Sequence, residues 1–277
     1  MKFIGLLMIN NEDDILEETL ATNAQYVDAF YVLDGTVPND DSKDICMAHR
    51  KCSGYTTDAW LPQEYGDKPK DGWRQHLYEQ AVADHGYDNW FLLLHGDEVW
   101  TFDPRDVADD AHGYFFLLPF YFPRAGEQWD NSQPPLEQLR WHLSPGYPEF
   151  RMFRGGEHVQ FDPLQHFDVR PKGLGSIAKV PLRINHYLYR SPDQQRARAQ
   201  LHQQTGFDPG NYNHIIEHDG VYWTDEMIAA YQAHPAGYFT ELEHDGAVLE
   251  MPKRTNEFVY DQPIMKLDPY PTPRTAA

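Results

Sequence analysis

Cysteine, basic residues and long apolar runs are all scarce in this chain of 277 residues. Only Cys46 and Cys52 occur, which excludes a disulfide-rich scaffold and favours a reducing compartment. Lys and Arg number 23 against 43 Asp and Glu, and the formal net charge is −20. So acidic a surface repels nucleic acid and anionic membranes, and we therefore expect neither as a partner.

The longest apolar stretch, Tyr114 to Phe122, is interrupted by Pro119 and is far shorter than the roughly 20 residues of a membrane-spanning helix. Acidic residues follow Ile9 almost at once, which is unlike a signal peptide. We therefore expect a cytoplasmic protein without a transmembrane segment. A metal hydrolase is disfavoured, because the 14 His residues form no His-Glu-x-x-His motif and no clustered Cys/His spacing.

Strand and helix patterns alternate in the first hundred residues, which is typical of βαβ units. Continuous apolar runs at Phe3–Ile9, Ala29–Leu33 and Trp90–Leu94 predict buried strands. Helical patterns follow Asn11 and open at Gly72. The sequence thus predicts an α/β fold in which a mostly parallel sheet is flanked by helices.

The rest of the chain is less regular. We expect a domain at residues 1–190 and a helical or irregular appendage at residues 191–277. The further strands predicted here are Gly113–Phe122, Phe150–Phe153, Val159–Phe161 and Arg183–Tyr189, and the further helices run from Pro192 to Gln204 and from Asp225 to Gln232.

Polar side chains follow three of the predicted strands. Because parallel strands end at a common crevice, these side chains should converge. Carboxylates at such an edge suit Mg²⁺ or Mn²⁺, and an acidic chain needs a cation to hold a substrate phosphate. Arg74 lies on the core-facing stripe of its helix and should reach the same crevice. The polar residues at the strand ends are Asn10, Asn11, Asp34, His95, Asp97 and Glu98.

Four segments together resemble the family 2-like glycosyltransferases of the GT-A fold. They are Phe3–Glu12, Tyr31–Asp34, the helix from Arg74, and Asn89–Glu98, which is similar to a strand running into that family's Asp-x-Asp-Glu metal motif. The resemblance implies a GT-A (Rossmann-like) domain. It also implies inverting transfer of a sugar from a UDP- or GDP-sugar to a hydroxyl of a saccharide or other acceptor, with Mn²⁺ or Mg²⁺.

The resemblance also implies roles for single residues. Asp34 would contact the base or ribose, Arg74 the diphosphate and Asp97 the metal. His95 stands where the family has the first acid of its motif, and His186 resembles a histidine that reaches the metal or the diphosphate.

Other candidate residues rest on position alone. Asn10 and Asn11 fit either a nucleotide contact or a helix cap, and Arg190 could help to hold phosphate. Inverting transfer needs a carboxylate that accepts the proton of the acceptor hydroxyl, and Glu149 and Asp168 are the candidates for that base.

Each candidate also has a structural interpretation. Asp34 could form a turn with the glycine that follows it. Asp97 could be an exposed turn acid, and Gly96 before it would let the chain turn tightly. Glu98 could cap a helix or form a salt bridge, and His186 could be a hydrogen-bonded core histidine. His95, in place of the first acid of the motif, also fits another class of protein, one that binds a nucleotide sugar or carbohydrate without catalysis.

Overall fold

The computed structural model describes residues 1–35, 41–57, 69–108, 111–123, 128–139, 141–143, 148–161, 170–205, 242–244, 247–249 and 265–266. The chain divides into two compact units. The domain boundary placed at residue 190 stays a prediction. The first unit comprises Met1–Leu117, Pro148–Ile184 and Glu241–Met251, and the second comprises Leu118–Tyr147, Asn185–Thr240 and Pro252–Ala277.

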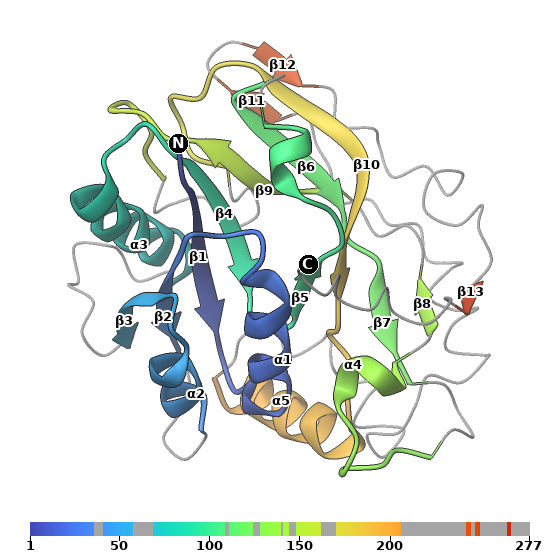
Figure 1. The fold of residues 1–277 in the computed structure, drawn as a ribbon. Coiled ribbons are helices and arrows are strands. Elements are labelled where there is room, and N and C mark those ends of the chain that lie inside the picture. The colour runs from blue at the N-terminus through green and yellow to red at the C-terminus, as the bar shows by residue number, and fades with distance from the viewer. Residues whose placement is uncertain are drawn as a thin grey trace, which may run out of the picture. The chain divides into compact units, whose positions relative to one another are not determined.

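Parallel strands in the order β3-β2-β1-β4 begin the first unit (Figure 1). β1 (Phe3–Ile9) lies between β2 (Ala29–Asp34) and β4 (Trp90–His95), and β3 (Cys52–Thr57) pairs with β2. The side chains of β1, β2 and β4 are almost all buried, because these continuous apolar runs are covered on both faces. The strands predicted at these three places are confirmed.

Helices connect these parallel strands, as parallel pairing requires. α1 (Asp13–Asn23) leads from β1 to β2, α2 (Ser42–Ala48) precedes β3, and α3 (Pro69–His85) precedes β4 (Figure 1). The helices after Asn11 and from Gly72 were predicted, although α3 begins earlier than expected. α2 and β3 were not predicted, because the polar residues after Asp34 concealed a short helix.

Beyond β4, one strand of the first unit, β9 (Pro148–Arg154), runs in the opposite direction. It pairs antiparallel with both β4 and β6 (Gly113–Leu117). β10 (Ile177–His186) then pairs parallel with β6, and β5 (Glu98–Trp100) also pairs with β10. A 3₁₀ turn at Pro104–Asp106 precedes β6.

The described strands of the second unit are short. β7 (Phe120–Phe122) pairs antiparallel with β8 (Trp141–Leu143), and the last residue of β10, His186, pairs with Phe120. The helix predicted from Pro192 to Gln204 is confirmed as α5 (Pro192–Thr205). The remaining described elements of this unit are β13 (Met265–Lys266), which pairs antiparallel with β8, and the helices α4 (Pro135–Gln138) and α5 (Pro192–Thr205).

The predicted fold class, a GT-A (Rossmann-like) mostly parallel sheet flanked by helices, is wrong. The described strands are mixed in direction and the helices are few: β9 pairs antiparallel with β4 and β6 in the first unit, and β8 pairs antiparallel with β7 and β13 in the second. The physical reason is the connection between strands: in the described residues from Glu98 to Arg154, the α-helix is only Pro135–Gln138, too short for a parallel crossover.

Smaller differences concern strand boundaries. The apolar run Gly113–Phe122 forms two strands, β6 and β7, which are separated by Leu118 and Pro119. Val159–Phe161 is no strand and makes a single bridge, from Gln160 to Lys172. The helix predicted at Asp225–Gln232 lies outside the described residues. A separate antiparallel pair is formed by β11 (Leu242–His244) and β12 (Ala247–Leu249).

Aromatic side chains fix α3 on the sheet of the first unit. The ring of Tyr78 lies 4.8 Å from that of Phe91 and 5.6 Å from that of Phe153, measured between centroids. Its hydroxyl donates to the carbonyl of Gly156 at 3.0 Å and accepts from the N–H of the same residue at 3.1 Å. Burial raises the pKa of Tyr78 to about 12. This residue is therefore a fixed anchor in the middle of the helix.

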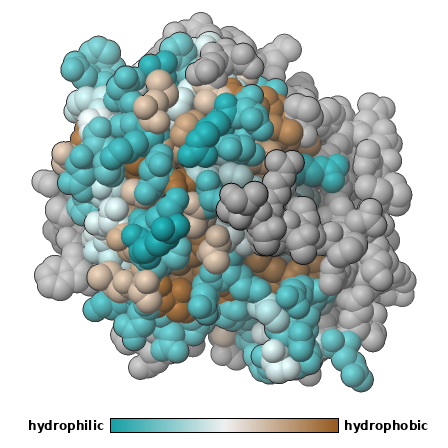
Figure 2. All heavy atoms as spheres, in the orientation of Figure 1, coloured by the Kyte–Doolittle hydropathy of each residue, from teal (hydrophilic) through white to brown (hydrophobic). Residues whose placement is uncertain are grey.

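Hydrophilic residues predominate in the coloured part of the surface in Figure 2, with apolar residues in smaller patches between them. Among the described residues the large apolar side chains that are exposed are Met1, Met47 and Tyr87. None of the described helices has the length and apolar character needed to cross a membrane.

Candidate functional site

Parallel strands of the first unit end at one edge of the sheet. In register, Ile9 of β1 pairs with Asp34 of β2, and Met8 pairs with His95 of β4. Asn10 follows β1 directly and is exposed. The antiparallel strand β9 lies on the far side of β4, so it leaves this arrangement of β2, β1 and β4 intact. The crevice argument therefore still applies at this edge of the mixed sheet.

Asp34 is buried at the end of β2, with an exposed fraction of 5%. Its carboxylate accepts a hydrogen bond from the hydroxyl of Tyr55 on β3. The residue after it, Gly35, is covered by the indole of Trp73, which would lie 3.6 Å from a Cβ atom placed on that glycine. A carboxylate with a hydroxyl and an aromatic ring thus line this end of the strand.

Arg74 lies one helical turn before Tyr78 in α3 and is only 2% exposed. Leu77 and Ala81 are buried on the same stripe of the helix. The packing of this stripe holds the base of the arginine side chain in place. A buried guanidinium is suited to bind an anionic group, because its donors form a planar fork.

Helix α1 fastens the turn that follows β4 through two buried polar side chains. The hydroxyl of Thr19 donates to the carbonyl of Gly96 at 2.6 Å. The amide of Asn23 donates to the carbonyl of Glu98 at 2.8 Å and accepts from the N–H of Trp100 at 3.0 Å. Thr19 and Asn23 are 2% and 3% exposed. The turn is therefore a fixed part of the core.

Replacing Asn23 with alanine should lower the free energy of unfolding by about 2 kcal/mol, because the variant removes both hydrogen bonds to buried main-chain groups. Alanine favours a helix more than asparagine does, so a loss would not come from α1 itself. Gln25→Ala is the matched control: its exposed amide donates to the carbonyl of Thr22 at 3.0 Å, and we expect a change within about 0.5 kcal/mol. Equal urea midpoints for both variants would contradict the role of Asn23.

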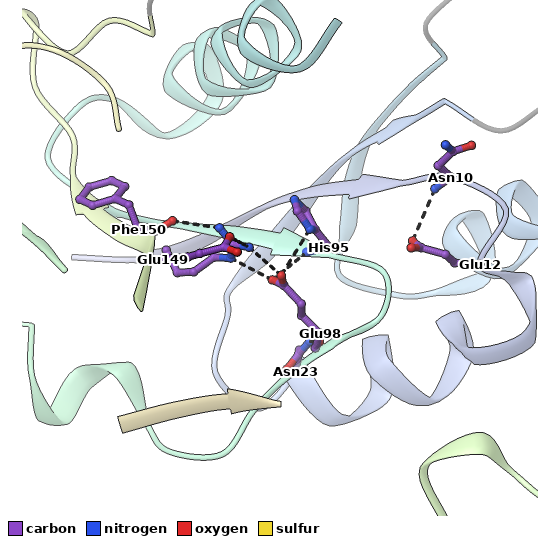
Figure 3. A network of polar contacts seen from close by, with 8 residues as sticks. Asn10, Glu12, Asn23, His95, Glu98, Glu149 and Phe150 are labelled. Carbon is purple, nitrogen blue, oxygen red and sulfur yellow. Dashed lines mark hydrogen bonds and ion pairs between the residues drawn. The ribbon is translucent and has the colours of Figure 1, made fainter. Parts of the chain in front are cut away.

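The turn from β1 into α1 brings Glu12 against Gly96. Glu12 is 6% exposed, and its carboxylate accepts from the main-chain N–H of Asn10 at 3.4 Å (Figure 3). A Cβ atom on Gly96 would collide with this carboxylate. The predicted turn at Gly96 and Asp97 is confirmed, but Gly96 has no positive φ, so the turn does not depend on the backbone freedom of glycine. Glycine is needed here for space.

Asn11 has a left-handed backbone, with φ of 57°, which asparagine tolerates better than most residues. The N-cap of α1 is Glu12, and no side chain makes a capping hydrogen bond there. A capping role for Asn10 or Asn11 is therefore wrong. Strained backbone of this kind is common at ligand sites, and both residues lie at the strand edge beside Asp34 and His95.

Glu98, Arg151 and Glu149 form an ionic network beside the turn (Figure 3). The side chains of Glu98 and Arg151 are 0% and 1% exposed. Arg151 donates from Nε to Glu98 Oε2 at 3.1 Å and from Nη2 to Glu98 Oε1 at 2.7 Å. Nη2 also contacts the half-buried carboxylate of Glu149. Burial alone would lower the pKa of Arg151, but the two carboxylates raise it above its ordinary value, and the guanidinium stays charged.

His95 is half-buried and contacts the same carboxylate. Its Nδ1 atom lies 3.3 Å from Glu98 Oε1, and its main-chain N–H donates to Glu98 Oε2 at 3.3 Å. Burial lowers the pKa of His95, the positive charges of Arg151 and Arg74 lower it further, and Glu98 opposes them. The pKa stays below its ordinary value. A neutral imidazole, which can bind a metal ion, is therefore the dominant form at neutral pH.

Asp97 is 1% exposed, so its interpretation as an exposed turn acid is wrong. Its two neighbours in the chain are both hydrogen-bonded. The carbonyl of Gly96 accepts from Thr19, and Glu98 accepts from Asn23 and Arg151. A buried carboxylate is costly unless it is paired or binds a cation. The role of Asp97 as a metal ligand stays a prediction.

Three further predicted site residues are His186, Arg190 and Asp168. His186 and Arg190 belong to the second unit, where they are 8% and 0% exposed. The N–H of His186 donates to the carbonyl of Pro119 at 3.1 Å, and Arg190 Nη1 donates to the carbonyl of Tyr187 at 2.9 Å. Asp168 lies outside the described residues. The roles assigned to these three residues stay predictions.

A divalent cation fits the donor chemistry of the β4 edge. His95 offers an imidazole nitrogen, and Asp97 offers carboxylate oxygen. Carboxylates suit both Mg²⁺ and Mn²⁺, whereas a nitrogen ligand favours the transition metal over Mg²⁺. Mn²⁺ or Mg²⁺ as the cofactor held by these two residues stays a prediction.

Two residues of the site were overlooked from the sequence. Arg151 stands in the apolar run Phe150–Phe153, where a charged side chain must find a partner if it is buried, and this signal was available. Asn23 gave no signal, because a polar residue near the end of a helix is ordinary. No protein-family model matches this chain, and no curated protein is significantly similar to it.

Proposed function

We propose that this protein is a glycosyltransferase that moves a sugar from a nucleotide-diphosphate sugar to an acceptor hydroxyl, with inversion. One observation carries the proposal. Asp34 and His95 end the parallel strands β2 and β4 on either side of β1, and Asp97 lies in the turn after β4. The side chain of Arg74 is buried, and its positive charge, like burial, lowers the pKa of His95.

Each of these groups suits one part of such a donor. The Asp34 carboxylate can accept hydrogen bonds from a base or ribose, and the indole of Trp73 beside Gly35 offers an aromatic face. Arg74 can donate to the diphosphate. A UDP- or GDP-sugar is the ligand class that needs all three, and the acceptor would be a saccharide or another alcohol.

The cation completes this proposal, because a chain with a net charge of −20 repels a diphosphate unless positive charge is placed beside it. His95 and Asp97 would hold Mn²⁺, which supplies Lewis-acid stabilisation of the leaving diphosphate when it is bound. Glu149 is the described candidate for the base, although Arg151 engages its carboxylate. The scarcity of cysteine supports a cytoplasmic location for the enzyme.

Calorimetry with UDP and GDP tests the proposal. We expect binding to be at least tenfold tighter with Mn²⁺ than with EDTA, and tighter with Mn²⁺ than with Mg²⁺, since a cation must bridge the diphosphate to the acidic site. The free nucleoside, which lacks phosphate, is the control ligand and should show little response to metal. Equal affinity for the diphosphate with Mn²⁺ and with EDTA would refute the metal-dependent site.

The contact of Glu149 with Arg151 favours a second candidate function, a protein that binds the nucleotide sugar without catalysis. A carboxylate held by a guanidinium is less ready to take a proton from an acceptor. Release of nucleotide from a UDP- or GDP-sugar separates the two candidates. A transferase hydrolyses its donor slowly even without acceptor, whereas a binding protein leaves it intact.

A further inference from the structure

We propose that Glu98 is a positioning residue that holds the imidazole of His95 in one orientation and one tautomer, with Nδ1–H toward Glu98 and the lone pair on Nε2. This inference rests on the proposed function in one respect, because it gives Nε2 of His95 the task of binding the cation. From the sequence alone, two interpretations of Glu98 were open, a helix cap and a salt bridge.

The two oxygens of Glu98 are each shared between the same two partners. Oε1 lies 2.7 Å from Arg151 Nη2 and 3.3 Å from His95 Nδ1. Oε2 lies 3.1 Å from Arg151 Nε and 3.3 Å from the main-chain nitrogen of His95. The carboxylate of Glu98 is thus fixed by a bidentate contact with Arg151, and it also contacts both the main-chain nitrogen and the ring of His95.

The chemistry of a carboxylate then decides the tautomer. An ionised carboxylate only accepts hydrogen bonds, and Arg151 keeps Glu98 ionised because it donates to both oxygens. The ring atom that faces Oε1 must therefore carry a hydrogen. In a neutral imidazole the lone pair is then on Nε2, and in Figure 3 one ring nitrogen of His95 points away from Glu98.

Burial makes this arrangement firm. Glu98 is wholly inaccessible, and the amide of Asn23 holds its main-chain carbonyl at 2.8 Å. A ligand histidine whose second nitrogen donates to a carboxylate is oriented and made a better donor, and loss of such a partner typically costs tenfold to a hundredfold in metal affinity. A plain structural ion pair between Glu98 and Arg151 would not require any contact with His95.

The test combines the tautomer and the affinity for Mn²⁺. Long-range ¹H–¹⁵N spectra of the metal-free protein labelled in its 14 His residues report which ring nitrogen is protonated, and His95→Gln identifies the signal. We expect Nδ1–H in the wild type. In Glu98→Gln the new amide can donate as well as accept, so we expect mixed tautomers and Mn²⁺ affinity that is about tenfold to a hundredfold lower.

Glu79→Gln is the matched control, because it makes the same change in an exposed carboxylate of α3, which accepts from the amide of Gln75 at 2.6 Å. Its affinity for Mn²⁺ should stay within about threefold of the wild type, since His95 keeps its partner. An Nε2–H tautomer in the wild type would overturn the inference, and this measurement does not depend on the folding of any variant. An unchanged tautomer and affinity in Glu98→Gln would overturn it too. If the wild type binds no Mn²⁺, the metal-dependent part of the proposed function is wrong. Loss of the Nδ1–H tautomer in Glu98→Gln would still show that Glu98 positions the ring of His95.

Discussion

Replacing Arg151 with methionine should lower the free energy of unfolding by about 3–5 kcal/mol, because the variant leaves the buried carboxylate of Glu98 without its cation. The side chains of Arg151 and Glu98 are 1% and 0% exposed, so water cannot take the place of the guanidinium. Methionine keeps most of the volume, which limits any cavity. Urea denaturation followed by circular dichroism measures the change.

Arg154→Met is the matched control, since Arg154 lies at the end of the same strand, β9. It pairs with Asp88 at 2.8 Å, but these side chains are 40% and 80% exposed. An exposed pair contributes little, and we expect a loss below about 1 kcal/mol. Similar losses in both variants would mean that methionine weakens the strand itself, and the stability assigned to the Arg151 network would then be wrong.

The strands at the start of the chain could be predicted because their apolar runs need no knowledge of partners. Phe3–Ile9 and Trp90–Leu94 read as buried strands and are β1 and most of β4. Whether a strand pairs parallel or antiparallel could not be predicted from its apolar run alone. Phe150–Phe153 is apolar except for Arg151 and was predicted as a strand, yet nothing in it shows that β9 is antiparallel. The available signal was the lack of a long helical pattern before it.

The candidate site was predictable to the same extent. Asp34 and His95 were placed correctly at the ends of parallel strands, because the residue that follows an apolar run lies at the sheet edge. The burial of Asp97 was not predicted. The turn that contains it is held by Thr19 and Asn23 of α1, which are more than seventy residues away in the chain. Contacts of this range leave no mark in local sequence.

The burial of Asp97 alters what its substitution can be expected to show. An exposed acid could be replaced without effect on folding, whereas a residue that is 1% exposed contributes to the turn in which it lies. Activity must therefore be measured on protein whose folded fraction is known. Asparagine is the appropriate substitute, because it keeps the shape of the side chain and removes only the charge.

Asp97→Asn should reduce sugar transfer by about a hundredfold or more in turnover, because the neutral amide holds a divalent cation poorly and the leaving diphosphate loses its stabilisation. The loss should be partly relieved at higher Mn²⁺ concentration, as is expected when a ligand to the metal is weakened. A purely structural effect would show no such relief. Turnover measured against Mn²⁺ concentration, on protein shown to be folded by its thermal transition, separates these two cases.

Asp88→Asn is the matched control, since it makes the same change just before β4, at the opposite end of the strand from Asp97. Asp88 is 80% exposed and contacts Arg154, so its loss should leave both turnover and the response to Mn²⁺ unchanged. If folded Asp97→Asn protein transfers sugar at the original rate with the original metal response, the metal site assigned to this edge is wrong. His95→Ala is measured beside Asp97→Asn. If both residues bind the same cation, both variants should depend on added Mn²⁺.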